Sequence, residues 1–526
     1  MKINGKIWAG RLKGVFTKLN PIHSLRPKRA APELVIESLS ARVHGRQLAQ
    51  YPVGPAEVFI SHDGEAGYYE ISEPSLSERE KRVYRDLFES FIYALEPEAV
   101  ETEDPAKFVE GAIWKAAEDL GLLEEVRRSF TKYQYFIGRD LGYGKLHVPM
   151  LDPDVAEITA VGYGKAVRVI HRKLANLGWL RTNIAFHSED EIQGYNLRLA
   201  QRFGKSLTAA VPMADIMTPE GHRVSLTFGD EITYPGSSVS IRKFPSEPFS
   251  LANLVGNRML SPLMAAYLWQ VLEHRGFVQI LGMVGGGKTT LLNALLASIN
   301  PNAKIITVED TMELRLPHEN WQRFHTRPVH FATSKRFKVD IFDLLTLVMH
   351  HRPDYVAVGE ARGAEIKSLT HASSLGHSCA STFHSDSPEA ALARMRADPM
   401  NLKDGDILRV WCFPIAAMIR RPSGEVVFRV TGIHEVNPTE EGKPELFEIF
   451  EYDVRTDSFS PDSPQEAAKR SRRLRESAGA RGMSKRELAD ELRRKAEFLE
   501  RLVKHRELGF EQYVQRAREF YAAQSR

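Results

Sequence analysis

The sequence has no long hydrophobic run. Nowhere do its apolar residues approach the roughly 18 in succession that a membrane-spanning helix needs, and no signal peptide is visible. Cysteine is scarce, with only Cys379 and Cys412 among 526 residues, which excludes a disulfide framework and a cysteine-based zinc site. These absences predict a protein of a reducing compartment, cytoplasmic or held at the inner face of the cell membrane from the cytoplasmic side.

A large excess of charge of either sign is also absent, since 71 Lys and Arg stand against 68 Asp and Glu. The first 32 residues are the exception, because they carry eight cations and no acid. On a helical wheel one face of this segment holds its large apolar side chains: Trp8, Leu12, Val15, Phe16 and Leu19. Such a segment, residues 1–20 in particular, is typical of a helix on an anionic membrane surface or against a partner protein. A solvated tail has the same composition, so all three interpretations stay open.

One glycine-rich stretch stands out among these ordinary bulk properties. Residues 282–289 read GMVGGGKT, the P-loop pattern, and lie between an apolar candidate strand at 277–281 and a candidate helix at 291–296. Backbone N–H groups of such a loop and the helix N-terminus bind phosphate oxygens, while the threonine after the lysine ligates Mg²⁺. The stretch therefore predicts ATP and Mg²⁺ as cofactors, with these nucleotide-binding residues: Gly282, Gly285, Gly286, Gly287, Lys288, Thr289 and Thr290.

Acidic residues follow two further candidate strands. Glu309 and Asp310 come directly after residues 305–308, and Glu360 follows residues 355–358. Strand ends beside a P-loop are where Mg²⁺ and the attacking water are held. We therefore predict that Glu309 polarises the water and that Glu360 is catalytic and, with Thr289, a metal ligand.

Two histidines flank the next candidate strand, residues 378–382. His377 precedes it and His384 follows it. An imidazole at this place could sense the γ-phosphate, so His384 is a candidate catalytic residue and His377 a candidate nucleotide-binding residue. Taken alone, each histidine is more typical of an ordinary polar residue. A zinc site is not expected, because no further ligands cluster with Cys379.

Composition and turn signals divide the chain into six segments. Residues 1–33 form a basic tail and linker, residues 34–150 a mostly helical domain after a short extended start, and residues 151–245 a small α/β domain. Residues 246–259, with two prolines nearby, are predicted to be a linker. Residues 260–455 alternate strands and helices, as a parallel sheet requires, and residues 456–526 form a helical C-terminal extension.

Together these motifs resemble the secretion ATPase superfamily, the motors of type II and type IV secretion, pili and archaella. Residues 282–289 match its Walker A motif, 308–313 its Asp box, with Glu309 as the glutamate that acts on water, 352–363 its Walker B motif and 376–394 its His box. Several further stretches resemble the archaeal branch: residues 143–146, 182–184, 199–205, 241–244, 313–321 and 398–402. The similarity runs from about residue 51 to residue 521. One departure is the loop centre, residues 284–287, where that branch commonly has a Thr-Ala-Ser-Gly type sequence.

The resemblance implies a RecA-like P-loop ATPase domain preceded by a helical segment and a small PAS-like α/β domain, with a C-terminal helical extension. It implies a homo-hexamer on a polytopic membrane platform protein, which would drive assembly or rotation of a type IV pilus-like filament, an archaellum or a secretion machine. ATP would bind between the two lobes of the subunit. Arg223 and Arg242 match the family's catalytic arginines, whose charge stabilises the transferring phosphoryl group.

Two rival functions stay in view. RecA-like rings also translocate nucleic acid, but the near-neutral net charge and the lack of a basic and aromatic track in the ATPase half argue against a nucleic-acid partner. The arginine-rich residues 469–475 keep that rival open. A nucleotide-gated scaffold would bind ATP without turnover.

Overall fold

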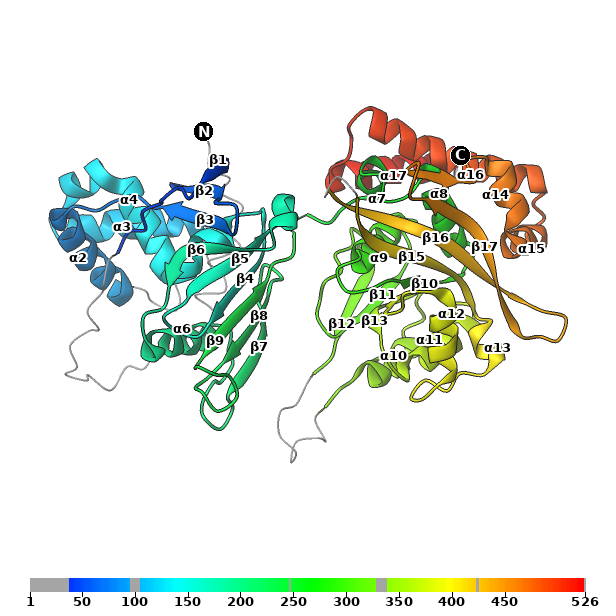
Figure 1. Cartoon of the computed structure of the whole chain (residues 1–526), viewed down its shortest axis with the longest axis horizontal. Coiled ribbons are helices and arrows are strands. Elements are labelled where there is room, and N and C mark those ends of the chain that lie inside the picture. Colours follow the sequence, from blue (N-terminus) through cyan, green and yellow to red (C-terminus); the bar gives the residue numbers. More distant parts are fainter. Residues whose placement is uncertain (1–36, 95–104, 246, 328–337, 422–424, 525–526) are drawn as a thin grey trace. The chain divides into compact units, whose positions relative to one another are not determined.

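The computed structural model describes residues 37–94, 105–245, 247–327, 338–421 and 425–524. The predicted basic tail, residues 1–33, lies outside the described residues. The chain divides into two compact units, Met1–Ser246 and Glu247–Arg526 (Figure 1). Within the described part of the chain, none of the helices combines the length and the apolarity that crossing a membrane requires.

The first unit is built on a nine-stranded sheet in the order β1-β2-β3-β6-β5-β4-β9-β8-β7. Its strands are β1 (Arg46–Val53), β2 (Ala56–His62), β3 (Gly67–Ser72), β4 (Val155–Val161), β5 (Ala166–His171), β6 (Trp179–Ala185), β7 (Met213–Met217), β8 (Arg223–Thr227) and β9 (Ser238–Arg242). Its helices are α2 (Glu78–Ala94), α3 (Pro105–Asp119), α4 (Leu123–Leu141), η2 (Gly144–Leu146), α5 (His147–Leu151), η3 (Arg172–Leu177) and α6 (Glu189–Arg202).

This sheet crosses the boundary that the sequence predicts at residue 150. Strand β3 pairs in parallel with β6, so that Tyr68 lies opposite Arg181. One hydrophobic core extends from Val53 to Ile241 and includes residues on both sides of the boundary. The helical segment and the α/β segment therefore share one folding unit. The structure differs from the predicted boundary because β1, β2 and β3 belong to one sheet with β6, a strand more than a hundred residues away in the sequence.

Serine side chains cap the N-termini of two helices in this unit. The Ser188 hydroxyl accepts the backbone N–H of Glu191 and opens α6. Ser77 and Glu80 form the reciprocal hydrogen bonds of a capping box at the start of α2. Such short-range hydrogen bonds fix helix starts without help from tertiary contacts.

The second unit contains another nine-stranded sheet, in the order β12-β11-β13-β14-β10-β15-β16-β17-β18. Its strands are β10 (Phe277–Leu281), β11 (Ile305–Glu309), β12 (Trp321–His325), β13 (Tyr355–Ala361), β14 (Ser378–Phe383), β15 (Val410–Arg420), β16 (Val426–Pro438), β17 (Pro444–Asp453) and β18 (Ser458–Ser460). Its helices are α7 (Leu251–Gly256), α8 (Pro262–Glu273), α9 (Lys288–Ala297), α10 (Ile341–His350), α11 (Glu365–Ser374), α12 (Pro388–Arg396), α13 (Asp404–Ile407), α14 (Pro464–Arg470), α15 (Arg472–Ala480), α16 (Lys485–Lys504) and α17 (Phe510–Gln524).

Only part of this sheet is parallel. The strands from β12 to β15 pair in parallel, as the sequence predicts, whereas β16, β17 and β18 continue the sheet in antiparallel pairs. The prediction of a parallel sheet over residues 260–455 therefore holds only as far as β15. Antiparallel neighbours need no crossover helix, so alternation of strands and helices is lost there.

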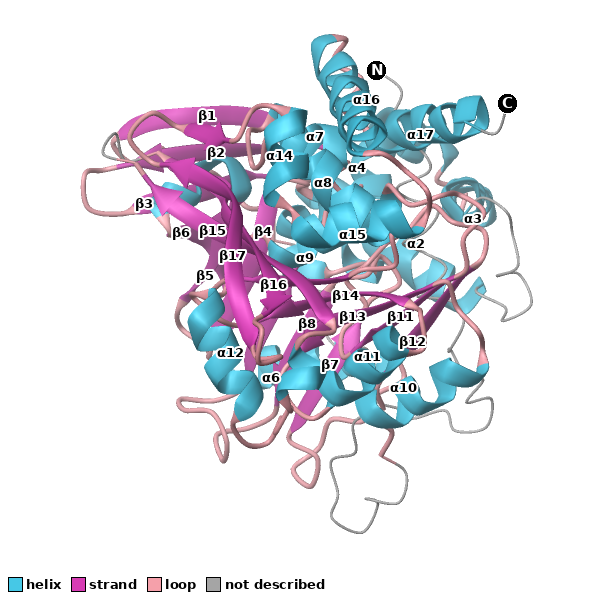
Figure 2. Ribbon diagram, turned by 90° about the vertical axis from the view of Figure 1, so that its right-hand side faces the viewer, coloured by secondary structure: helices cyan, strands magenta, loops and turns pink. Residues whose placement is uncertain are grey.

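Two cores cover the two faces of the parallel strands. Along β10, Val278 and Ile280 enter one core, and Phe277 and Leu281 enter the other, as strand alternation requires. Helices α10 and α11 pack side by side over the second core (Figure 2). Covered on both faces, β10, β11 and β14 are buried at every position.

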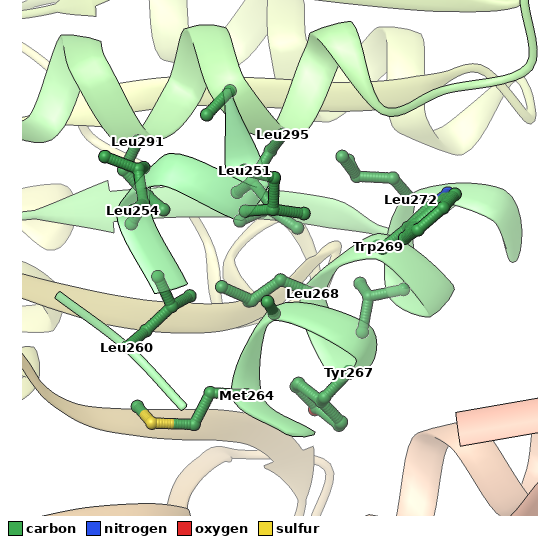
Figure 3. Close-up of a cluster of buried hydrophobic side chains, with 14 of the residues drawn as sticks. Leu251, Leu254, Leu260, Met264, Tyr267, Leu268, Trp269, Leu272, Leu291 and Leu295 are labelled. Carbon is green, nitrogen blue, oxygen red and sulfur yellow. The ribbon is translucent and has the colours of Figure 1, made fainter. Parts of the chain in front are cut away.

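The predicted linker, residues 246–259, is largely structured. It contains α7, whose Leu251 and Leu254 are buried with Trp269 of α8 and Leu295 of α9 (Figure 3). Helix α16 of the C-terminal extension packs against both α7 and α8. The linker prediction was wrong because the nearby prolines precede a helix. The C-terminal helices complete the core of the second unit.

Candidate active site

The glycine-rich loop joins β10 to α9 at the carboxyl end of the parallel strands. The Ala416 carbonyl oxygen of β15 lies directly against Gly282 and Gly286, and a Cβ added at Gly286 would lie 2.6 Å from that oxygen. Any larger side chain there would push β15 away from the loop. Gly285 and Gly287 complete the loop before α9 begins at Lys288. Tertiary contact with β15 thus holds the loop that the sequence predicts for phosphate binding.

Lys288 is nearly buried at the first turn of α9, with 8% of its surface exposed. Its ammonium donates to the Met283 carbonyl oxygen at 2.9 Å and lies 3.4 Å from Nδ1 of His384. Thr289 and Thr290 follow and are partly exposed. The Lys288 ammonium therefore lies over the loop. There it and the N-terminus of α9 would both contact phosphate oxygens.

Glu360 lies at the carboxyl end of β13 and contacts His384 and Arg362. One oxygen lies 2.7 Å from Nε2 of His384, and the other accepts a hydrogen bond of 2.6 Å from Arg362. Burial is the largest single influence on the Glu360 pKa and raises it. The hydrogen bond and charge of Arg362, followed by the Lys288 charge, outweigh burial and lower the pKa, so the carboxylate is ionised near neutral pH.

His384 links this carboxylate to Lys288. Burial, followed by the Lys288 charge, lowers the His384 pKa against the opposing effect of Glu360. The imidazole is therefore neutral near pH 7, with one nitrogen facing the lysine and the other facing the glutamate.

Glu309 ends β11 with a carboxylate that is only 1% exposed. One oxygen accepts the backbone N–H groups of Glu313 and Leu314, each at 2.9 Å. The other has no hydrogen-bond partner among the described residues, and Arg323 lies 4.0 Å from it. Burial raises the pKa of Glu309 to about 7. A buried carboxylate with one free oxygen and such a pKa is suited to accept a proton.

The sheet register brings Glu309 next to Glu360. Val308 of β11 pairs with Val358 of β13, so Glu309 is level with Gly359. A Cβ added at Gly359 would lie 3.1 Å from Cγ of Glu309, so glycine leaves room for this side chain. The two glutamates therefore end adjacent strands at the same edge as the P-loop.

The structure does not place His377 at this edge. It precedes β14, and its Nδ1 lies 2.6 Å from the Pro353 carbonyl oxygen. Six strand residues, a length of about 20 Å, separate that end of β14 from His384. The assignment of His377 to nucleotide binding is thus contradicted, because a parallel strand presents only its carboxyl end to the P-loop.

Arg223 and Arg242 belong to the first unit, where they are direct neighbours. The register of β8 and β9 sets them opposite each other, and both are exposed. Arg223 forms an ion pair of 3.3 Å with Asp215. Like charges directly opposite each other on a sheet are destabilising. The position of Arg223 opposite Arg242 therefore lowers the stability of the sheet, which a functional role of the two arginines would explain.

Sequence reasoning missed three contributors to the site. Arg362 holds Glu360, Gly359 admits Glu309, and Ala416 shapes the P-loop. Arg362 could have been found, since it follows Glu360 by only two residues, just past the end of β13. The contact of Ala416 has no local signal.

The residues present fit a magnesium–nucleotide complex. The described residues contain no group of three or more His, Cys, Asp or Glu that could hold a metal by themselves. Mg²⁺ at nucleotide sites needs no such group, because phosphate oxygens and waters supply most of its ligands. The Thr289 hydroxyl and the ionised Glu360 carboxylate are oxygen donors of the appropriate kind.

Comparison with known proteins finds relatives of this chain. A family model described as type II/IV secretion system protein matches residues 180–410. An uncharacterized protein of Methanocaldococcus jannaschii is 33% identical over 411 residues, with 73% of each chain covered. A second uncharacterized protein of that organism is 37% identical over 271 residues, which cover 51% of this chain and 96% of the relative. Among solved structures, the Yersinia pseudotuberculosis ATPase DotB is 16% identical with a TM-score of 0.42, over 72% of this chain and 92% of that one.

Proposed function

Because this chain is an ATPase of the type II/IV secretion system protein family, we propose that it is a Mg-dependent motor that drives assembly or rotation of a pilus-like filament, an archaellum or a secretion machine. The observation that carries the proposal is the edge of the second sheet. There the P-loop lysine, the Glu360–His384 pair and the buried Glu309 end adjacent parallel strands. Ligands of open α/β sheets bind outside such strand ends.

Each group has a distinct task in the proposed reaction. Lys288 and the N-terminus of α9 neutralise the β- and γ-phosphates. Bound Mg²⁺ would be held by Thr289 and Glu360 and would supply positive charge to the phosphate oxygens. The free oxygen of Glu309 takes a proton from the water that attacks the γ-phosphorus, and ADP and phosphate are released. His384, which is neutral, positions Glu360 without adding charge.

We further propose that six subunits form a ring on the cytoplasmic side of a polytopic membrane platform protein. Support comes from family membership alone. A deletion strain, complemented with the wild-type chain or with Lys288→Ala, tests the motor function when it is scored separately for swimming and for surface adhesion. Normal behaviour of the deletion strain in both assays, together with normal secretion, would refute the proposal.

The arginine-rich stretch that favours nucleic-acid translocation is engaged within the chain. Arg470 pairs with Glu466, and Arg472 pairs with Glu476. Arg473 donates to backbone carbonyl oxygens and stacks over Trp411, 4.9 Å from the ring centroid. Since these cations are already engaged within the chain, ATPase activity should not rise with added DNA.

Glu360→Gln is expected to retain ATP binding while losing hydrolysis. The Glu360 carboxylate donates no hydrogen bond to the phosphates of ATP. Its replacement removes a negative charge from their vicinity, so the affinity for ATP should not fall. Its loss removes a metal ligand and the partner of His384 and Arg362. Equilibrium ATP binding and phosphate release measure the two effects separately, with Glu389→Gln at the exposed start of α12 as the control. Parallel loss of binding and turnover would contradict this role.

Arg223→Ala and Arg242→Ala should each lower kcat by roughly tenfold or more, as expected for arginines that act on the transferring phosphoryl group. ADP binding should not change, because ADP lacks the γ-phosphate. Arg168→Ala, likewise exposed on the same sheet, serves as the matched control. Mixing either variant with Lys288→Ala subunits would distinguish action within a subunit from action across a ring. Normal turnover in both variants would exclude these arginines from the site.

A further inference from the structure

The hairpin of β15 and β16 extends past the P-loop. Leu281, the last residue of β10, pairs with Ile415, so residues 416–420 of β15 continue beyond the end of β10. Residues 426–430 of β16 pair with this extension. At its base the Ala416 carbonyl contacts the loop itself. The hairpin therefore forms a wall beside the loop that is predicted to bind phosphate.

This wall bears an uncovered apolar pair where it passes the start of α9. Met418 and Phe428 are direct register partners, so they share one face of the hairpin. They are 56% and 42% exposed, whereas the preceding pair on that face, Ala416 and Val430, is buried. A Cβ added at Gly287 would lie 3.8 Å from Cδ1 of Phe428. The exposed ring thus lies at the N-terminus of α9, beside the phosphate-binding loop.

We propose that the Phe428 ring, with the Met418 thioether beside it, is the surface on which the base of the bound nucleotide stacks. The inference rests on the proposed function, because the phosphates must lie on the P-loop for the base to reach Phe428. A base is a flat apolar ring joined to the phosphates through ribose, which matches an exposed aromatic ring adjoining a phosphate site. Aromatic stacking and sulfur–ring contacts both stabilise such an arrangement.

Stacking also determines what this surface cannot do. Every base has a π-face, so stacking contributes affinity with little discrimination between bases. Phe428 is therefore an affinity residue, and ATP and GTP should be weakened to a similar extent when its ring is removed. A hydrogen-bonding selectivity residue would instead affect one base alone.

The test compares a ligand that has a base with one that has none. Wild type, Phe428→Ala, Phe428→Trp and Met418→Ala are titrated with Mg-ATP and with Mg-tripolyphosphate by calorimetry. Phe447→Ala, an exposed phenylalanine on β17 that is 53% exposed, is the matched control. Phe428→Ala should weaken ATP binding by about 5- to 150-fold, the range for loss of one stacked base, and leave tripolyphosphate binding unchanged. Phe428→Trp should restore ATP affinity, and Met418→Ala should have a smaller effect.

Two results would overturn the inference. The first is an ATP affinity of Phe428→Ala within twofold of the wild-type value. If this variant also loses subunit assembly, Phe428 is a contact between copies of the chain and not a stacking surface for the base. The other is equal loss of ATP and tripolyphosphate in all Phe428 variants, which would assign the ring to the shape of the loop. Failure of the wild-type chain to bind either ligand would instead refute the proposed function itself.

Discussion

Replacing Lys288 by alanine is expected to abolish ATP turnover and to weaken ATP binding by roughly a hundredfold, the equivalent of one lost hydrogen bond to a charged group. The lysine is nearly buried in the loop, with its ammonium 2.9 Å from the Met283 carbonyl oxygen. Two further cations near this site are already engaged, Arg362 with Glu360 and Arg394 with the His384 carbonyl oxygen. Among the described residues of this unit, neither of these arginines is therefore positioned to replace Lys288 against the phosphates.

Calorimetric titration with ATP and steady-state phosphate release measure the two effects of Lys288→Ala. Lys443→Ala, an exposed lysine beside the β16–β17 turn, controls for loss of a positive charge elsewhere in the same unit. Turnover by Lys288→Ala close to the wild-type rate would mean that the loop does not bind the phosphates.

Glu309→Gln is expected to lower the hydrolysis rate by about 10²–10⁴-fold, the usual contribution of a general base. The amide keeps the shape of the side chain and can still accept the N–H groups of Glu313 and Leu314. It cannot accept a proton from water, so ATP binding should survive. Asp310→Asn is the control, because Asp310 is exposed and bonded to Thr326. A single-turnover rate near that of wild type in Glu309→Gln would exclude the general-base role.

The pKa of Glu309 predicts a pH dependence for the same reaction. Because only the ionised carboxylate accepts a proton, the wild-type rate should rise with pH and level off above about 7. The residual rate of Glu309→Gln should lack this step. A step of the same size in both proteins would assign the titration to another group.

The raised pKa of Glu309 also means that its ionised form lowers the free energy of unfolding. Its folded pKa of about 7 exceeds the ordinary value of 4.5, so the folded chain binds the extra proton, and stability falls as pH rises through that window. At pH 8 the full cost is present, and Glu309→Gln should raise the free energy of unfolding by on the order of 3 kcal/mol. Below pH 4.5 the difference should vanish. Urea denaturation at the two pH values measures it, and a variant no more stable at pH 8 would contradict the raised pKa.

The sequence by itself determined the parts of the site that follow from local chemistry. The P-loop glycines lie where the pattern predicts them, and the strands predicted at 277–281, 305–308 and 355–358 lie within β10 (Phe277–Leu281), β11 (Ile305–Glu309) and β13 (Tyr355–Ala361). It also predicted that Glu309 and Glu360 follow adjacent strands, because parallel strands present their carboxyl ends at one edge.

Tertiary structure decided everything that depends on pairing between distant strands. The contact of Ala416 with the P-loop, the junction of β3 with β6, and the burial that raises the Glu309 pKa each join residues far apart in the sequence. His377 and His384 look alike as residues beside a strand, and only the direction of β14 separates them. Local patterns specify where a strand begins and ends, but long-range packing decides which strand lies beside it and which side chains lose contact with water.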